Sequence, residues 1–130
     1  MFKMDAVGLF VTDMTKMVAF YRDVMEMKTD WNGSPDAVLT SGQQRLIMFS
    51  RANFEKMTEQ VYTYPAGTNG TMELSFSVPR FHDVDIAYAK ALKAGAQPVF
   101  APADEPWGQR TSYIKDPDGN LIEISSFNRN

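Results

Sequence analysis

The chain has 130 residues, of which 44% are hydrophobic and 22% charged, a composition typical of one compact globular domain. Its net charge is -3, which argues against nucleic-acid binding, because such binding needs a basic patch or stripe. It contains no cysteine and a single histidine, which excludes disulfides, thiolate chemistry and any site that needs two imidazoles. Since no apolar run is long enough to span a membrane, we expect a soluble cytoplasmic protein with neither nucleic-acid nor membrane partners.

An internal repeat organises the chain. With a shift of 67 positions, residues 6–11 align with residues 73–78, and the apolar residues that follow keep the spacing of one helix face. Each half is therefore predicted to open with a strand and continue with an amphipathic helix. Asp13 or Thr15 is expected to cap the first helix, and Gly95 to end the second.

The rest of each half has the pattern of strands joined by turns. Strands are predicted at residues 28–31, 37–40 and 45–50 in the first half, and at 97–100, 110–115 and 120–126 in the second. A short helix is expected at residues 51–60, and a tight hairpin turn at 116–119, where the sequence is DPDG. The prediction is a single domain of two βαβββ modules, at about residues 1–64 and 71–130, joined by a linker at 65–70.

Alternation along the strands sorts their side chains onto two faces of the sheet. For the last strands, residues 46–50 are aligned with residues 121–125. The apolar face, expected to carry the helices, then holds Val7, Leu9, Val11, Ile47, Phe49, Leu74, Phe76, Val78, Ile122 and Ile124. The other face, expected to be the floor of a cleft, holds Ala6, Gly8, Phe10, Met48, Glu73, Ser75, Ser77, Leu121, Glu123 and Ser125.

Three stretches, residues 10–25, 107–110 and 116–124, together with the duplicated module, resemble the vicinal oxygen chelate superfamily. This superfamily includes glyoxalases, bleomycin resistance proteins and extradiol dioxygenases. The resemblance covers essentially the whole chain. It implies an α+β fold in which two βαβββ modules form a curved mixed sheet around a cleft, with helices on the outer face, usually in a homodimer.

The metal enzymes of this superfamily bind their ion from cleft-facing positions on the first and last strands of each module. Carried over to this sequence, those positions are Ala6, Met48, Glu73 and Glu123. Glu123 matches the terminal Glu of the family, and Glu73 stands where a His is common. Because Ala6 and Met48 supply no usable donor for a hard divalent ion, no tightly bound metal or other cofactor is expected. The alternative is a divalent ion held weakly by Glu73 and Glu123.

The predicted ligand cleft is lined by Phe10, Met48, Glu73, Trp107, Arg110 and Glu123. Glu73 and Glu123 are the candidate catalytic residues, because two converging carboxylates repel each other and favour protonation of one, which suits general acid or base chemistry. The structural alternative is that each carboxylate is hydrogen-bonded to a neighbouring strand or solvated.

Trp107 and Arg110 suit stacking and anion recognition of a small ligand. Alternatively, Trp107 covers the edge of the core and Arg110 pairs with Glu105 or Glu123. His82 is expected to be a partly exposed residue at the start of the second helix, outside the cleft.

The leading hypothesis is a metal-independent small-molecule binding protein that resembles the bleomycin-resistance branch. The alternative is a glyoxalase-like lyase or isomerase acting on a small carbonyl or thiol-adduct substrate. In that case a weakly held divalent ion would polarise the carbonyl while a Glu moves a proton. A purely structural or regulatory dimer is the third hypothesis.

Overall fold

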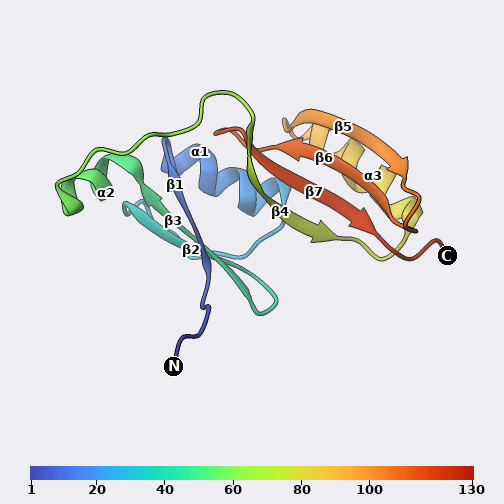
Figure 1. Ribbon diagram of the computed structural model, residues 1–130, viewed down its shortest axis with the longest axis horizontal. Helices are drawn as coiled ribbons and strands as arrows, with labels where there is room; N and C mark the ends of the chain where they lie inside the picture. Colours follow the sequence, from blue (N-terminus) through green and yellow to red (C-terminus); the bar gives the residue numbers. More distant parts are fainter. The chain divides into compact units, whose positions relative to one another are not determined.

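The computed structural model describes residues 1–130 and divides the chain into two compact units, Met1–Tyr64 and Pro65–Asn130 (Figure 1). Each unit contains one mixed sheet, of three strands in the first and four in the second. The predicted α+β class is confirmed. None of the helices is both long and apolar enough to cross a membrane.

The first unit is built on a three-stranded sheet in the order β1-β3-β2. Its strands are β1 (Val7–Val11), β2 (Asp36–Ser41) and β3 (Gln44–Ser50). β1 runs parallel to β3, and β2 runs antiparallel to it. Helix α1 (Met14–Ala19) continues into a single π-helical turn, η1 (Phe20–Val24), and helix α2 (Arg51–Thr58) follows β3.

Asp13 caps α1, because its carboxylate accepts the Lys16 backbone N–H at 3.1 Å. The apolar side of the α1–η1 segment is buried, with Met17 and Tyr21 fully inaccessible and Phe20 8% exposed. The predicted helix is thus present, but it widens into a π-turn that the periodicity does not foretell.

The prediction of a strand at residues 28–31 is wrong. Only one bridge forms there, between Lys28 and Thr40. The Thr29 hydroxyl donates to the Val38 carbonyl at 2.8 Å and accepts the Trp31 backbone N–H at 3.2 Å. These side-chain bonds replace the ladder that a strand would need, so this module has one strand fewer than expected.

The second unit follows the predicted βαβββ order. It contains β4 (Asn69–Ser77), α3 (Phe81–Lys93), β5 (Gln97–Asp104), β6 (Arg110–Lys115) and β7 (Asn120–Ser126). The sheet order is β4-β7-β6-β5, with β4 parallel to β7 and the other pairs antiparallel. α3 contacts β5, β6 and β7 (Figure 1), and buries Phe81, Val84 and Ala91.

The DPDG turn fixes the β6–β7 hairpin. The buried Asp116 carboxylate accepts the backbone N–H groups of Asp118 and Asn120 at 2.9 and 3.0 Å, and the Asn120 amide at 2.9 Å. The resulting register places Tyr113 opposite Glu123.

The faces of the second sheet alternate as predicted. Ile122 and Ile124 are buried, while Ser75 pairs with Glu123 on the opposite face. The hydrogen-bonded hairpin therefore brings Tyr113 and Glu123 to the face that lacks the helix.

The face assignment of β3 is wrong. Met48 is 2% exposed and pairs with the buried Leu9, whereas Ile47 is 39% exposed and pairs with Gly8. Gly8 corresponds in the repeat to Ser75, whose partner is Glu123. Ile47 rather than Met48 therefore occupies the position equivalent to Glu123, and a shift of one residue inverts every side chain of a strand.

Candidate functional site

A pocket of about 780 Å³ lies on the face of the second sheet opposite α3. Strand β4 contributes Glu73 and Ser75, β6 contributes Tyr113, and β7 contributes Glu123. The loop that precedes β6 adds Trp107 and Gln109. Alternate residues of three neighbouring strands thus converge, because side chains two apart share a face.

The Glu123 carboxylate is the centre of this pocket, and it is 8% exposed. Its Oε1 accepts a hydrogen bond from the Ser75 hydroxyl at 2.7 Å. Its Oε2 accepts from the Thr111 hydroxyl at 2.7 Å, the Tyr113 hydroxyl at 3.2 Å and the Gln109 amide at 3.3 Å. All four donors are uncharged, so the carboxylate is held by hydrogen bonds rather than by an ion pair.

Tyr113 lies between the two carboxylates that the sequence singled out. Burial raises the pKa of the Tyr113 hydroxyl, and a hydrogen bond with Glu73 and the negative charge of Glu123 raise this pKa further. The phenol therefore keeps its proton and has one hydrogen to share between two acceptors.

Trp107 takes part in the same network through Gln109. Its indole N–H donates to the Gln109 Oε1 at 2.7 Å, and the Gln109 amide nitrogen in turn faces Glu123. This bond fixes which end of the Gln109 amide points toward the carboxylate. The Trp107 side chain is nevertheless 64% exposed, which leaves its ring available for contact.

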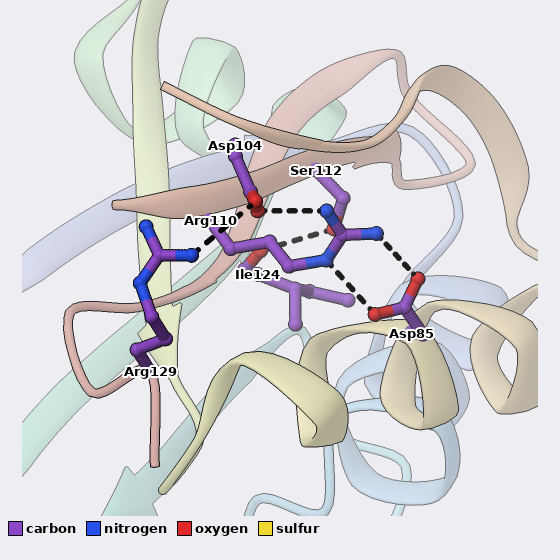
Figure 2. A network of polar contacts seen from close by, with 6 residues as sticks. All are labelled: Asp85, Asp104, Arg110, Ser112, Ile124 and Arg129. Carbon is purple, nitrogen blue, oxygen red and sulfur yellow. Dashed lines mark hydrogen bonds and ion pairs between the residues drawn. The ribbon is translucent and has the colours of Figure 1, made fainter. Parts of the chain in front are cut away.

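Arg110 does not line this pocket. Its guanidinium donates to both carboxylate oxygens of Asp85 in α3, at 2.9 and 2.7 Å, and to Asp104 in β5 at 2.8 Å (Figure 2). Asp104 also lies 3.8 Å from Arg129. Arg110 points toward the helix because it alternates with Thr111 along β6. Its partners are Asp85 and Asp104 rather than Glu105 or Glu123.

The first unit has a separate pocket of about 600 Å³, and its lining is almost wholly apolar. Phe10 lines it, together with Gly8, Val38 and Ile47. The Phe54 ring of α2 packs against Phe10 with a centroid distance of 4.1 Å. Met48 also borders this pocket, although its side chain is 2% exposed and belongs to the buried face of the sheet.

The predicted site residues are therefore distributed over two places. Glu73, Trp107 and Glu123 line the polar pocket of the second unit, and Phe10 and Met48 border the apolar pocket of the first. His82 is exposed on α3, as expected. Prediction from sequence missed Thr111 and Tyr113, although alternation along the strand preceding β7 carried the signal that places both beside Glu123.

The side chains present do not fit the metal centre that the sequence resemblance implies. Nowhere do three or more His, Cys, Asp or Glu side chains come together in a group that could hold a metal ion. Within the second unit, the Oε2 of Glu123 already accepts three hydrogen bonds. In the first unit, the positions equivalent to Glu73 and Glu123 are Ala6 and Ile47, and neither side chain has a donor atom.

Comparison with known proteins identifies relatives along nearly the whole chain. The model of the Glyoxalase/Bleomycin resistance protein/Dioxygenase superfamily matches residues 3–124. The chain is 30% identical to the uncharacterized protein YraH of Bacillus subtilis, over 94% of this chain and 96% of that protein. It is 27% identical to a virulence protein of Salmonella typhimurium, over 96% of this chain and 84% of that protein.

Solved structures share the fold at lower identity. A glyoxalase/bleomycin resistance protein/dioxygenase family enzyme from Burkholderia phytofirmans has a TM-score of 0.81 and 23% identity, covering 93% of this chain and 95% of that one. A lactoylglutathione lyase from Agrobacterium tumefaciens has a TM-score of 0.71 and 23% identity, covering 95% and 92%.

Proposed function

Because this chain belongs to the Glyoxalase/Bleomycin resistance protein/Dioxygenase superfamily, we propose that it binds a small organic molecule without a tightly held metal ion. The polar pocket of the second unit is the proposed binding site. A ligand pocket typically combines apolar walls with a few fixed polar groups, and here Trp107 provides a wall while Glu73 and Glu123 provide the polar groups.

The observation that carries the proposal is the hydrogen bonding of Glu123. Hydroxyl and amide hydrogens from Ser75, Gln109, Thr111 and Tyr113 point at its two oxygens. A metal ion bound to Oε2, which accepts three of these hydrogen bonds, would have to displace donors, since cation and hydrogen compete for the same lone pairs. Tight transition-metal sites also need three or more protein ligands, which this donor set does not supply.

The test is the metal content of the protein as purified, with its melting temperature before and after dialysis against a chelator. We expect less than one metal ion per chain and an unchanged melting temperature, because a ligand that does not bind cannot stabilise the fold. One tightly bound transition metal per chain, lost in the Glu123→Gln variant and retained in an Asp30→Asn control at an exposed acid outside the pocket, would overturn the proposal.

A lyase or isomerase is the second candidate function, and the placement of Tyr113 supports it. A phenol shared by two carboxylates allows a proton to pass between a substrate and Glu73 or Glu123. Turnover of small carbonyl or thiol-adduct substrates by wild-type protein, lost in Glu123→Gln, would favour this candidate.

We further propose that the protein is a homodimer and lies in the cytoplasm. Edge strands support the dimer, because β1 and β2 border the first sheet and β4 and β5 the second, and natural proteins usually cover such edges.

A further inference from the structure

We propose that the ligand of the polar pocket carries a protonated amine on an aromatic or similarly flat apolar body. This inference rests on the proposed small-molecule binding function and specifies the chemical class of the ligand. Two features of the pocket support it: its carboxylates have no cationic partner, and its rim is aromatic.

The charge of the pocket is uncompensated. No basic residue lines it, although two carboxylates do, and Glu123 is more than nine-tenths buried. The three arginines of the same unit are engaged elsewhere. Arg80 pairs with Asp83, Arg110 with Asp85 and Asp104, and Arg129 with Asp104. A buried carboxylate without an ion partner is unfavourable, so a cation from outside the protein is its natural complement.

The hydrogen-bonding capacity of the pocket also favours a donor-rich ligand. Each carboxylate oxygen has two lone pairs, and the Oε1 of Glu123 accepts only from Ser75. Tyr113 has one hydrogen for two carboxylates. Hydrogen-bond acceptors therefore outnumber donors in the pocket. The three N–H groups of a protonated amine would supply the missing donors.

A negatively charged group or a divalent metal ion would fit this pocket less well. An anion would meet the two carboxylates without a basic residue to offset them. A divalent ion would need ligands in a cage that Glu73 and Glu123 do not complete. An ammonium requires only hydrogen bonds of ordinary length, so the existing donors to Glu123 can stay in place.

The rim of the pocket supplies the apolar contact. The side chains of Trp107 and Phe127 both line it and are 64% and 69% exposed. Because the Trp107 N–H is bonded to Gln109, the indole is anchored in the loop and can accept a flat ligand without first being ordered.

The experiment compares three probes of nearly equal shape: 2-phenylethylamine, 2-phenylethanol and phenylacetate, which are positive, neutral and negative at pH 7. Binding is followed by thermal shift and by tryptophan fluorescence. We expect the amine to bind about tenfold more tightly than the alcohol, with phenylacetate weakest, because a charge-assisted hydrogen bond is stronger than a neutral one.

Variants then locate the effect. Glu73→Gln and Glu123→Gln should each weaken amine binding about tenfold and leave 2-phenylethanol nearly unaffected. Asp30→Asn removes an equal charge outside the pocket and should change neither the binding of the amine nor that of 2-phenylethanol. Glu73 is exposed and lies on β4, so its variant remains informative if Glu123→Gln fails to fold.

Three outcomes would overturn the inference: the alcohol or phenylacetate binding as tightly as the amine, the amine binding unchanged in Glu73→Gln, or no probe binding up to about 20 mM. None of these three outcomes refutes the proposed function, provided that the purified protein contains no tightly bound metal ion. A stoichiometric transition metal held by Glu123 would instead refute the proposed function itself.

Discussion

Gly119 combines a left-handed backbone conformation with a lack of space for a side chain. Its φ is +89°, and a Cβ built there would lie 2.0 Å from the Gly67 carbonyl oxygen. Relief would require movement of backbone rather than of a flexible side chain. We therefore expect Gly119→Ala to lower the free energy of unfolding by about 3 kcal/mol, as a sum of conformational strain and steric clash.

Gly42 provides the matched control for this prediction. Its φ is +58°, but no heavy atom lies within 4 Å of the added Cβ, so Gly42→Ala should cost only about 1 kcal/mol. Urea melts of the two variants separate strain from clash. Equal losses would show that the approach of Gly67 to Gly119 does not constrain the chain.

The residues of the candidate site were predictable only where alternation was unambiguous. Glu123 lies between two isoleucines, so its face is clear from the sequence. Ser75 is predicted on the same face, and the register of the sheet makes it the partner of Glu123. Met48 lies in an apolar run in which either phase is plausible, and the alignment of residues 46–50 with residues 121–125 gives the wrong one. Arg110 is predicted to line the cleft because it is close to Trp107 in the chain, although alternation along β6 turns it toward α3.

At the scale of elements, Arg110 connects α3 to the sheet. Its guanidinium is bidentate to Asp85, and the two side chains are 22% and 48% exposed. We expect Asp85→Asn to lower the free energy of unfolding by about 1 kcal/mol at pH 7, a modest value because solvent screens the pair. Asp23→Asn, which removes a more exposed pairing with Arg22, should have no measurable effect.

The same pair gives a pH dependence. The hydrogen bond from Arg110 holds the pKa of Asp85 below its ordinary value of 3.8, although partial burial opposes the shift. A carboxyl with a lowered pKa in the folded state stabilises the protein above the unfolded pKa and loses this contribution as the pH falls through the folded one. The stability difference between wild type and Asp85→Asn should thus be full at pH 7 and shrink below about pH 4. A difference that stays constant down to pH 2 would contradict this account.

The α1–η1 segment allows a test of the first unit's core. Phe20 is 8% exposed and packs edge-on against Tyr21, with ring centroids 5.2 Å apart. Phe20→Ala should lower the free energy of unfolding by about 3–5 kcal/mol, because it leaves a cavity among well-packed side chains. Denaturant melts measure the loss, and a value under about 1 kcal/mol would show that this ring contributes little to the core.

The elements themselves were largely predictable. β6 and β7 have the expected bounds, and the DPDG turn sets the end of β6 and the start of β7. The segment 28–31 has a strand-like composition, yet hydrogen bonds of the Thr29 side chain compete with pairing. Such local competition and the widening of α1 into η1 both depend on particular contacts. The spacing of apolar residues in the sequence does not predict these contacts.

At the scale of the whole molecule, the open face of the first sheet exposes apolar surface. Phe10, Val38 and Ile47 are 42%, 39% and 39% exposed, and Ile47 pairs directly with Val38 in the sheet. Monomeric proteins rarely leave contiguous apolar surface uncovered unless it binds a partner or ligand. This exposed face agrees with the homodimer that family resemblance implies.

We therefore expect light scattering at micromolar concentration to give a mass twice the 14.7 kDa of one chain. Ile47→Lys places a charge on the open face and should shift the protein toward the monomer, since a buried unpaired charge opposes association. Ile86→Lys makes the same change at a 52% exposed position on α3 and should leave the dimer intact. A monomeric wild type would refute the dimer. An Ile47→Lys protein that remains dimeric would show that the interface lies elsewhere and would assign the apolar face to a ligand instead.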